Sequence, residues 1–204
     1  MANDFIGLLI GGKLRAKIVA KADDYFRNNI PVSRIDDSYL RHVELVRKYS
    51  VELANQYGGD PFVAEIAALL HDIGADAGPV HAEESAKTAK DLLEQWGIEN
   101  SVKDKILSAI IHHSMVQEGE YFVEEVPIED VVVRDADGIA FLEDTYIFFM
   151  AKQLKKMPID EAKEVSLRKI KGMFNKVKTE KGIEIAKRYY PQAENYINNY
   201  HADV

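Results

Sequence analysis

Apolar residues recur every three or four positions along nearly the whole chain, and no stretch of useful length alternates between apolar and polar residues. Residues 13–29 show this spacing clearly, because Leu14, Ile18 and Ala22 fall on one side of a helix. A period near 3.6 is typical of helices that bury one face, whereas half-buried strands alternate with a period of two. The sequence therefore predicts an all-α fold.

Glycine, proline and capping residues mark where these helices should begin and end. Asp60 followed by Pro61, for example, is typical of a helix start. A loop is predicted at residues 75–80, and residues 118–127 form the longest irregular segment, which could cover the mouth of a pocket. We expect helices at about 13–29, 36–57, 60–74, 81–96, 101–116 and 128–142, then two or three more in the C-terminal part.

With 204 residues, the chain is long enough to form a single domain with a sizeable core. The apolar residues 5–10 are too few to span a membrane, and they follow Asp4 rather than a basic segment, so we expect neither a membrane anchor nor a signal peptide. Cysteine is absent, which excludes disulfides and thiolate metal sites. These features favour a cytoplasmic protein.

The formal net charge of -8 argues against bulk nucleic-acid binding, which depends on neutralising many phosphates. The charge is uneven, however, because residues 152–188 carry twelve Lys and Arg against five Asp and Glu, a local balance of +7. This segment is either a solvated helical face or a patch that collects phosphate over an active site.

The histidines are concentrated in one part of the sequence. Five of the six fall between residues 42 and 113: His42, His71, His81, His112 and His113. Histidine is the commonest protein ligand for metals, and neutral imidazoles combined with carboxylates suit Zn, Fe, Mn or Ni. This concentration indicates a metal site.

Two aspartates within apolar helices strengthen that interpretation. Asp72 follows a run of alanine and leucine, and Asp135 has apolar residues four and three positions before it and four after it. A buried carboxylate without a partner is costly, so each needs a metal or another cation. Asp137 is a nearby alternative to Asp135, and it could also contact the metal ligands without binding the metal itself.

Each histidine also has a plainer interpretation. His42 lies on a core-facing stripe and could be a hydrogen-bonded core residue, and His81 could simply belong to the first turn of its helix. Adjacent helical residues point about 100° apart, so His112 and His113 do not easily bind one ion. Either one of them is a ligand and the other is exposed, or a second ion allows both to bind.

The ordered set resembles the HD superfamily of metal-dependent phosphohydrolases, named after an adjacent His-Asp pair. The order His42, His71-Asp72, Asp135 follows that superfamily, and the string Ala-Leu-Leu-His-Asp-Ile-Gly at 68–74 is similar to its central motif. The strings around His81 and His112-His113 resemble the extra histidine motifs of its two-metal phosphodiesterase branches. The resemblance covers about residues 35–145, leaving an N-terminal helix and a C-terminal helical extension at 146–204.

The resemblance implies a helical bundle with a divalent transition metal (Fe, Mn, Ni or Zn) bound among its helices. One ion would be held by His42, His71, Asp72 and Asp135. A second ion, which we expect, would share Asp72 and add His81, His112 and His113. His71 and Asp72 would be the central catalytic residues, with water activated by the metal attacking phosphorus.

The resemblance therefore predicts hydrolysis of a nucleotide or another small phosphate ester. Ala75 stands where many two-metal phosphodiesterases carry a lysine, so the substrate class stays open, and a nucleotide pyrophosphohydrolase is the alternative among enzymes. A non-catalytic HD domain that senses nucleotides is a second alternative. A purely structural helical protein is a third, but it leaves the ordered ligand set unexplained.

Overall fold

A computed structural model of the protein describes residues 2–34, 37–114 and 126–201. Their regular structure is entirely helical, with no strand in the described part, as the apolar spacing predicts. Most of the irregular segment expected at 118–127 lies outside the described residues. The α-helices are α1 (Ala2–Asn28), α2 (Asp37–Tyr57), α3 (Pro61–Leu70), α4 (His81–Gln95), α5 (Asn100–His112), α6 (Ile128–Ala140), α7 (Tyr146–Leu154), α8 (Ile159–Asn175) and α9 (Glu180–Asn198).

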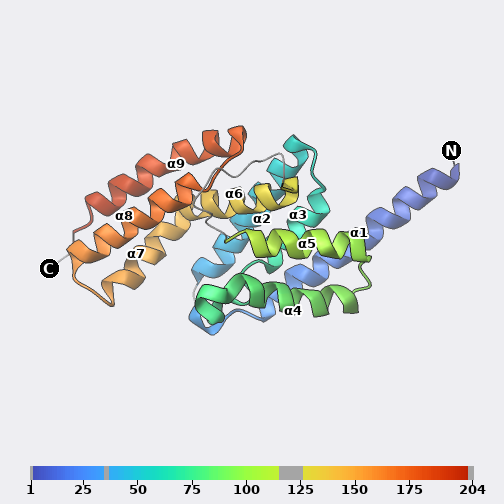
Figure 1. Ribbon diagram of the computed structural model, residues 1–204, viewed down its shortest axis with the longest axis horizontal. Helices are drawn as coiled ribbons and strands as arrows, with labels where there is room; N and C mark the ends of the chain where they lie inside the picture. The colour runs from blue at the N-terminus through green and yellow to red at the C-terminus, as the bar shows by residue number, and fades with distance from the viewer. Residues whose placement is uncertain (1, 35–36, 115–125, 202–204) are drawn as a thin grey trace.

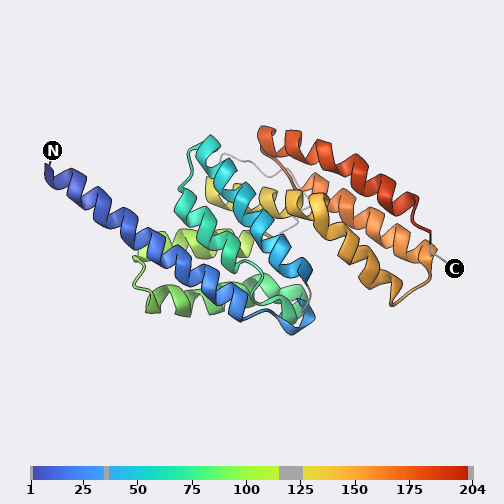
Figure 2. The same ribbon diagram turned by 180° about the vertical axis from the view of Figure 1, so that it is seen from behind.

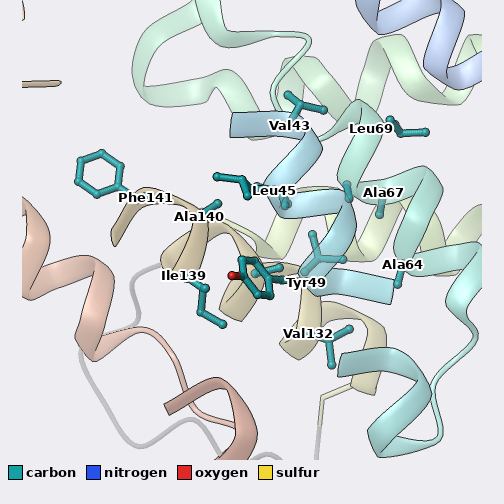
Figure 3. Close-up of a cluster of buried hydrophobic side chains, with 14 of the residues drawn as sticks. Val43, Leu45, Tyr49, Ala64, Ala67, Leu69, Val132, Ile139, Ala140 and Phe141 are labelled. Carbon is teal, nitrogen blue, oxygen red and sulfur yellow. The ribbon is translucent and has the colours of Figure 1, made fainter. Parts of the chain in front are cut away.

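Three helices form the centre of the molecule, because α2 packs against both α3 and α6. Their facing sides are apolar, and Figure 3 shows Leu45, Ala67 and Val132 from these three helices within one buried cluster. α6 is buried from Glu129 to its end at Ala140, which requires partners for the charged side chains that it carries. The centre therefore combines an apolar core with several buried acids.

The other helices surround this centre. α4 and α5 pack together, and α5 also contacts α3 and α6, while α1 lies against α3 and its N-terminal turns project beyond the body (Figures 1 and 2). At the opposite end, α7, α8 and α9 pack against one another, and α8 and α9 also contact α6. The C-terminal helices therefore reach the centre as well as each other.

The structure differs from the expectations made from sequence in three places. α1 begins at Ala2 and not near residue 13, because Gly11 and Gly12 weaken a helix without breaking it. The predicted loop at 75–80 is a 3-10 segment, η2 (Ala75–Val80), in which Gly78 adopts the left-handed φ of 64°. α6 continues through a π-helical turn, η3 (Phe141–Thr145), directly into α7. None of the helices in these described ranges has the length and apolar character that crossing a membrane requires.

Candidate metal centre

The end of α3 places His71 and Asp72 in the interior. Asp60 caps the start of this helix by accepting a hydrogen bond from the backbone N–H of Phe62 at 3.0 Å, and Pro61 occupies the first turn. An almost fully buried run follows, so the helix ends deep in the protein. His71 and Asp72 are only 1% and 5% exposed.

Gly74 allows the start of α4 to approach this pair closely. A Cβ atom at Gly74 would lie 2.6 Å from the backbone nitrogen of Ser85 and 2.8 Å from the backbone oxygen of His81. The Gly74 N–H donates to the Ser85 hydroxyl at 2.9 Å. Because only glycine fits here, the two chain segments touch, and His81 comes next to Asp72.

Three histidines share one local arrangement. The Nδ1 atoms of His71, His81 and His113 lie 2.7, 2.9 and 2.6 Å from the carbonyl oxygen three residues earlier in the chain. A carbonyl oxygen only accepts hydrogen bonds, so Nδ1 must carry the proton in each ring. Each Nε2 atom then presents a lone pair, which is the form that binds a metal.

These lone pairs converge on Asp72. The ligand atoms of His42, His71 and Asp72 lie within 4.8 Å of one another, and so do those of Asp72, His81 and His113. Oδ2 of Asp72 is 4.0 Å from Nε2 of His71. Oδ1 is 3.6 Å from Nε2 of His81 and 3.8 Å from that of His113. Asp72 therefore belongs to two groups and turns one oxygen toward each.

Two features show that the arrangement suits cations. The Nε2 atom of His71 is buried and has no hydrogen-bond partner among the residues that the structure describes. The Nε2 atoms of His81 and His113 are 3.3 Å apart, although carbonyl acceptors hold the proton of each ring at Nδ1. Two nitrogens bound to one tetrahedral zinc ion at about 2.1 Å would be about 3.4 Å apart. The donor set of imidazoles and a carboxylate thus fits divalent metals.

Burial and charge favour the protonation states that metal ligands need. Burial lowers the pKa of His113 to about 3, and it also lowers the pKa of His71. Burial alone would raise the pKa of Asp72, but its electrostatic interactions with His71 and with the guanidinium of Arg34 hold it below its ordinary range. These imidazoles are neutral and this carboxylate is ionised near pH 7, so the ligands are ready to bind.

The structure does not bring Asp135 to the histidines, contrary to our expectation. One carboxylate oxygen accepts from the backbone N–H of Lys178 at 2.9 Å, and the other accepts from the backbone N–H and the hydroxyl of Thr179, both at 2.7 Å. Thr179 is the N-cap of α9, so Asp135 holds the start of that helix. Because these bonds occupy both oxygens, Asp135 serves to anchor α9.

Asp137 is the carboxylate that α6 turns toward the histidines. Its Oδ1 is 3.2 Å from Nε2 of His42, and its Oδ2 accepts from the ammonium of Lys176. Two residues along a helix correspond to a rotation of about 200°, so Asp135 and Asp137 point to opposite sides of α6. Sequence alone could not choose between them, because the whole helix is buried.

His112 also differs from our expectation. Its Nδ1 is 2.6 Å from Oδ2 of Asp130, which also accepts from the hydroxyl of Ser108 at 2.7 Å. The ring of His113 lies 4.8 Å, centroid to centroid, from that of His71. Neighbouring helical residues point about 100° apart, and this separates the pair: His113 joins the candidate metal centre, whereas His112 contacts Asp130.

Two cations at this centre could not be identified from sequence. Arg34 lies 3.4 Å from Oδ2 of Asp72, on the short helix η1 (Val32–Arg34). Asp76 holds that segment by accepting from the backbone N–H groups of Val32 and Ser33 at 2.8 and 2.7 Å. Lys176, which donates to Asp137, also donates to the carbonyl of His113 at 3.2 Å. The excess of Lys and Arg over Asp and Glu in residues 152–188 indicated only that this C-terminal segment could supply a cation.

Comparison with known proteins identifies the fold. YpgQ from Bacillus subtilis in complex with ADP matches with a TM-score of 0.69 at 18% identity, covering 94% of this chain and 97% of that one. An HD-superfamily hydrolase from Bacillus thuringiensis matches at 0.68 and 22% identity, covering 90% and 95%. A predicted HD superfamily hydrolase from an uncultured Thermotogales bacterium matches at 0.53 and 22%, covering 91% and 88%. At these identities the likeness shows the fold alone.

The family follows from the sequence itself. No curated protein is significantly similar in sequence to this chain. A model of the HD domain, however, matches residues 39–142, about half of the chain and close to the range of 35–145 that the motifs indicate. The match includes His42, the His71-Asp72 pair and Asp137. The chain therefore belongs to the HD domain family.

Proposed function

We propose that this protein is a metal-dependent phosphohydrolase that acts on a small phosphorylated substrate, with a nucleotide as the favoured class. The observation that carries the proposal is the position of Asp72, whose two oxygens face two separate groups of histidine nitrogens. In this proposal, His42, His71, Asp72 and Asp137 hold one divalent ion, and Asp72, His81 and His113 hold a second. Such ions would polarise a phosphoryl oxygen and activate water for attack on phosphorus.

The surrounding residues support the binding of an anionic substrate. Arg34 is 43% exposed at its side chain while it contacts Asp72, so this cation is partly open to a phosphate from solvent. Burial lowers the pKa of Lys169 on α8, and the charges of Asp137 and Asp72 partly oppose this effect, so its ammonium interacts with carboxylates of the candidate centre. Both cations can bind phosphate oxygens while imidazoles and carboxylates bind the metal.

The nucleotide class is supported by one comparison. The similar YpgQ from Bacillus subtilis has been crystallised with ADP. A phosphohydrolase that releases inorganic phosphate and a pyrophosphohydrolase that releases pyrophosphate both fit the same metal groups. Phosphorus NMR of the products from a nucleoside triphosphate separates these two reactions.

The proposal is tested by the variant Asp72→Ala. We expect it to lose both bound ions and phosphate release, because Asp72 is the ligand that both groups share. The control is Asp104→Ala, at an exposed position of α5, which should keep metal and activity. Metal content by elemental analysis and turnover of a nucleotide panel are measured on both variants.

Each result has a definite meaning. Full metal content and activity in Asp72→Ala would refute the site. A wild-type protein that binds metal and nucleotide without forming any product would instead support the non-catalytic, nucleotide-sensing alternative.

A further inference from the structure

The π-helical turn η3 places a threonine hydroxyl against a histidine of the metal centre. The Oγ1 atom of Thr145 lies 3.1 Å from Nδ1 of His42, and both side chains are buried. π-helical turns are rare in proteins as a whole, and those that occur often lie at functional sites. This turn joins α6, which carries Asp137, to α7, and it contacts α2, which carries His42.

His42 differs from the other three histidines in what holds its Nδ1 atom. His71, His81 and His113 have backbone carbonyls at that position, which fix the proton there. A hydroxyl can donate or accept, so it does not fix the proton by its nature. If the ring carried its proton on Nε2, that N–H would point at Oδ1 of Asp137, 3.2 Å away, and the nitrogen could not bind a metal.

The second hydrogen bond of Thr145 favours a proton on Nδ1 of His42. Its hydroxyl donates to the carbonyl of Ala140, five residues earlier, at 3.4 Å. With its proton directed there, the oxygen is left to accept from the Nδ1–H of His42. We propose that Thr145 is a positioning residue that sets the tautomer of His42, so that the Nε2 lone pair faces the metal centre. This inference rests on the proposed function, in which His42 is a metal ligand.

Contacts on both sides hold the turn in place. The hydroxyl of Tyr49 donates to Glu143 at 2.5 Å and lies 3.2 Å from the hydroxyl of Tyr189 on α9. His42 and Tyr49 are seven residues apart on α2, so they share one face of that helix, and both contact the turn. Figure 3 shows Tyr49 within the buried cluster, where Ala140 marks the end of α6. The turn also packs against α9, so the position of Thr145 is fixed from two neighbouring helices.

The test compares Thr145→Val, which keeps the shape and removes the hydroxyl, with Thr145→Ser, which keeps the hydroxyl. The first readout is the histidine tautomer in metal-free protein at pH 8, from nitrogen NMR, with the His42 signals identified by their loss in His42→Ala. We expect Nδ1–H in the wild type and in Thr145→Ser, and Nε2–H in Thr145→Val. The second readout is affinity for Mn²⁺ or Zn²⁺ by titration, which should fall 10- to 100-fold in Thr145→Val and recover in Thr145→Ser.

A matched control is Thr88→Val, at a half-buried position of α4, which should change neither readout. If Thr145→Val does not fold, Thr145→Ala removes the same hydroxyl without the branched side chain and is judged by the same readouts. An unchanged tautomer and an unchanged affinity without the hydroxyl would overturn the inference.

The two proposals can fail separately. A wild-type protein that binds no divalent metal, but in which the tautomer of His42 changes in Thr145→Val, would refute the proposed function and leave the role of Thr145 standing. If the wild type and Thr145→Val bind metal with equal affinity and His42 has the same tautomer in both, the role of Thr145 is refuted and the proposed function stands.

Discussion

At the scale of single residues, the centre depends on which atom of each side chain is left without a partner. The histidine rings use Nδ1 for hydrogen bonds inside the protein and leave Nε2 for the shared space around Asp72. Asp135 and Asp137 differ in the same way, because backbone N–H groups surround the first while His42 and Lys176 contact the second. These assignments lead to two predictions.

The first prediction separates the two aspartates. Asp135→Asn should keep both ions but lose about 1–3 kcal/mol of stability, because an amide nitrogen cannot accept from the N–H groups at the start of α9. Asp137→Asn should lose the ion of His42 and His71 and retain the ion of His81 and His113. Metal stoichiometry and urea denaturation of both variants check this. Retention of both ions by Asp137→Asn, with loss of one by Asp135→Asn, would restore the expectation made from sequence.

The second prediction concerns the pH dependence of stability in metal-free protein. The pKa of His113 falls from its ordinary value to about 3 on folding, and that of His71 is also lowered. Between these values and about 6.5 the unfolded chain binds more protons than the folded one, so stability is present above pH 6.5 and is lost as the pH falls. The slope approaches about 1.4 kcal/mol per pH unit for each buried neutral histidine.

Urea denaturation between pH 8 and pH 4.5 measures this slope. The variant His113→Gln should show a shallower dependence, because it has lost one of the two groups. A free energy of unfolding that stayed constant from pH 7 to pH 5 would contradict the prediction.

At the scale of elements, the spacing between helices decides which side chains meet. Gly74 lets the start of α4 touch the segment after α3, and Gly138 in α6 does the same for α8, since a Cβ there would lie 2.7 Å from the carbonyl of Met173. Both glycines therefore serve close approach and not backbone flexibility. The first of them controls how near His81 comes to Asp72.

The third prediction follows from that contact. Gly74→Ala should push α4 away and weaken binding of the ion held by His81 and His113, while the ion held by His42 and His71 stays. Gly172→Ala, in α8 where nothing lies within 4 Å of an added Cβ, is the control and should keep both ions and stabilise the protein by about 0.4–1 kcal/mol. Two-site metal titrations of both variants provide the measurement. Equal binding at both sites in Gly74→Ala would show that α4 can shift without moving His81.

Sequence predicted the elements well and the contacts between them only in part. The helical class followed from apolar spacing, the start of α3 from Asp60-Pro61, and the starts of α4 and α6 from the ends of the irregular segments expected at 75–80 and 118–127. The choice between Asp135 and Asp137 did not, because both lie in a fully buried helix and the partners that distinguish them, Thr179 and Lys176, come from distant parts of the chain. Periodicity also cannot reveal the π-helical turn that carries Thr145.

At the scale of the whole molecule, the C-terminal helices belong to the centre although they lie outside the family match. Lys176 contacts both Asp137 and the backbone of His113, and Thr179 binds Asp135. Figure 1 shows α8 and α9 alongside the end of α6. The basic segment 152–188 therefore brings positive charge to a site rich in carboxylates, in a protein whose formal net charge is -8.

The fourth prediction tests whether that charge binds substrate. Lys169→Gln should raise KM for a nucleoside triphosphate roughly tenfold with little change in kcat, since one charged contact to phosphate contributes on the order of 1.5 kcal/mol. The control Lys171→Gln removes an equal charge from an exposed position two residues along α8 and should leave KM nearly unchanged. Steady-state kinetics at low and high salt distinguish the two variants. An equal effect of both would assign the role to net charge and not to Lys169.

The bonds from His71, His81 and His113 to carbonyls three residues earlier have a consequence for how this centre can vary. Each ring is hydrogen-bonded to its own turn of backbone, which restricts its rotation, so the ring moves together with that turn. The separation between the two groups of candidate ligand atoms around Asp72 therefore changes when whole helices slide or tilt. Substitutions far from these side chains, wherever they change the packing of α4 or α5, can therefore change the distance between the two groups of ligand atoms without altering any of the proposed ligands.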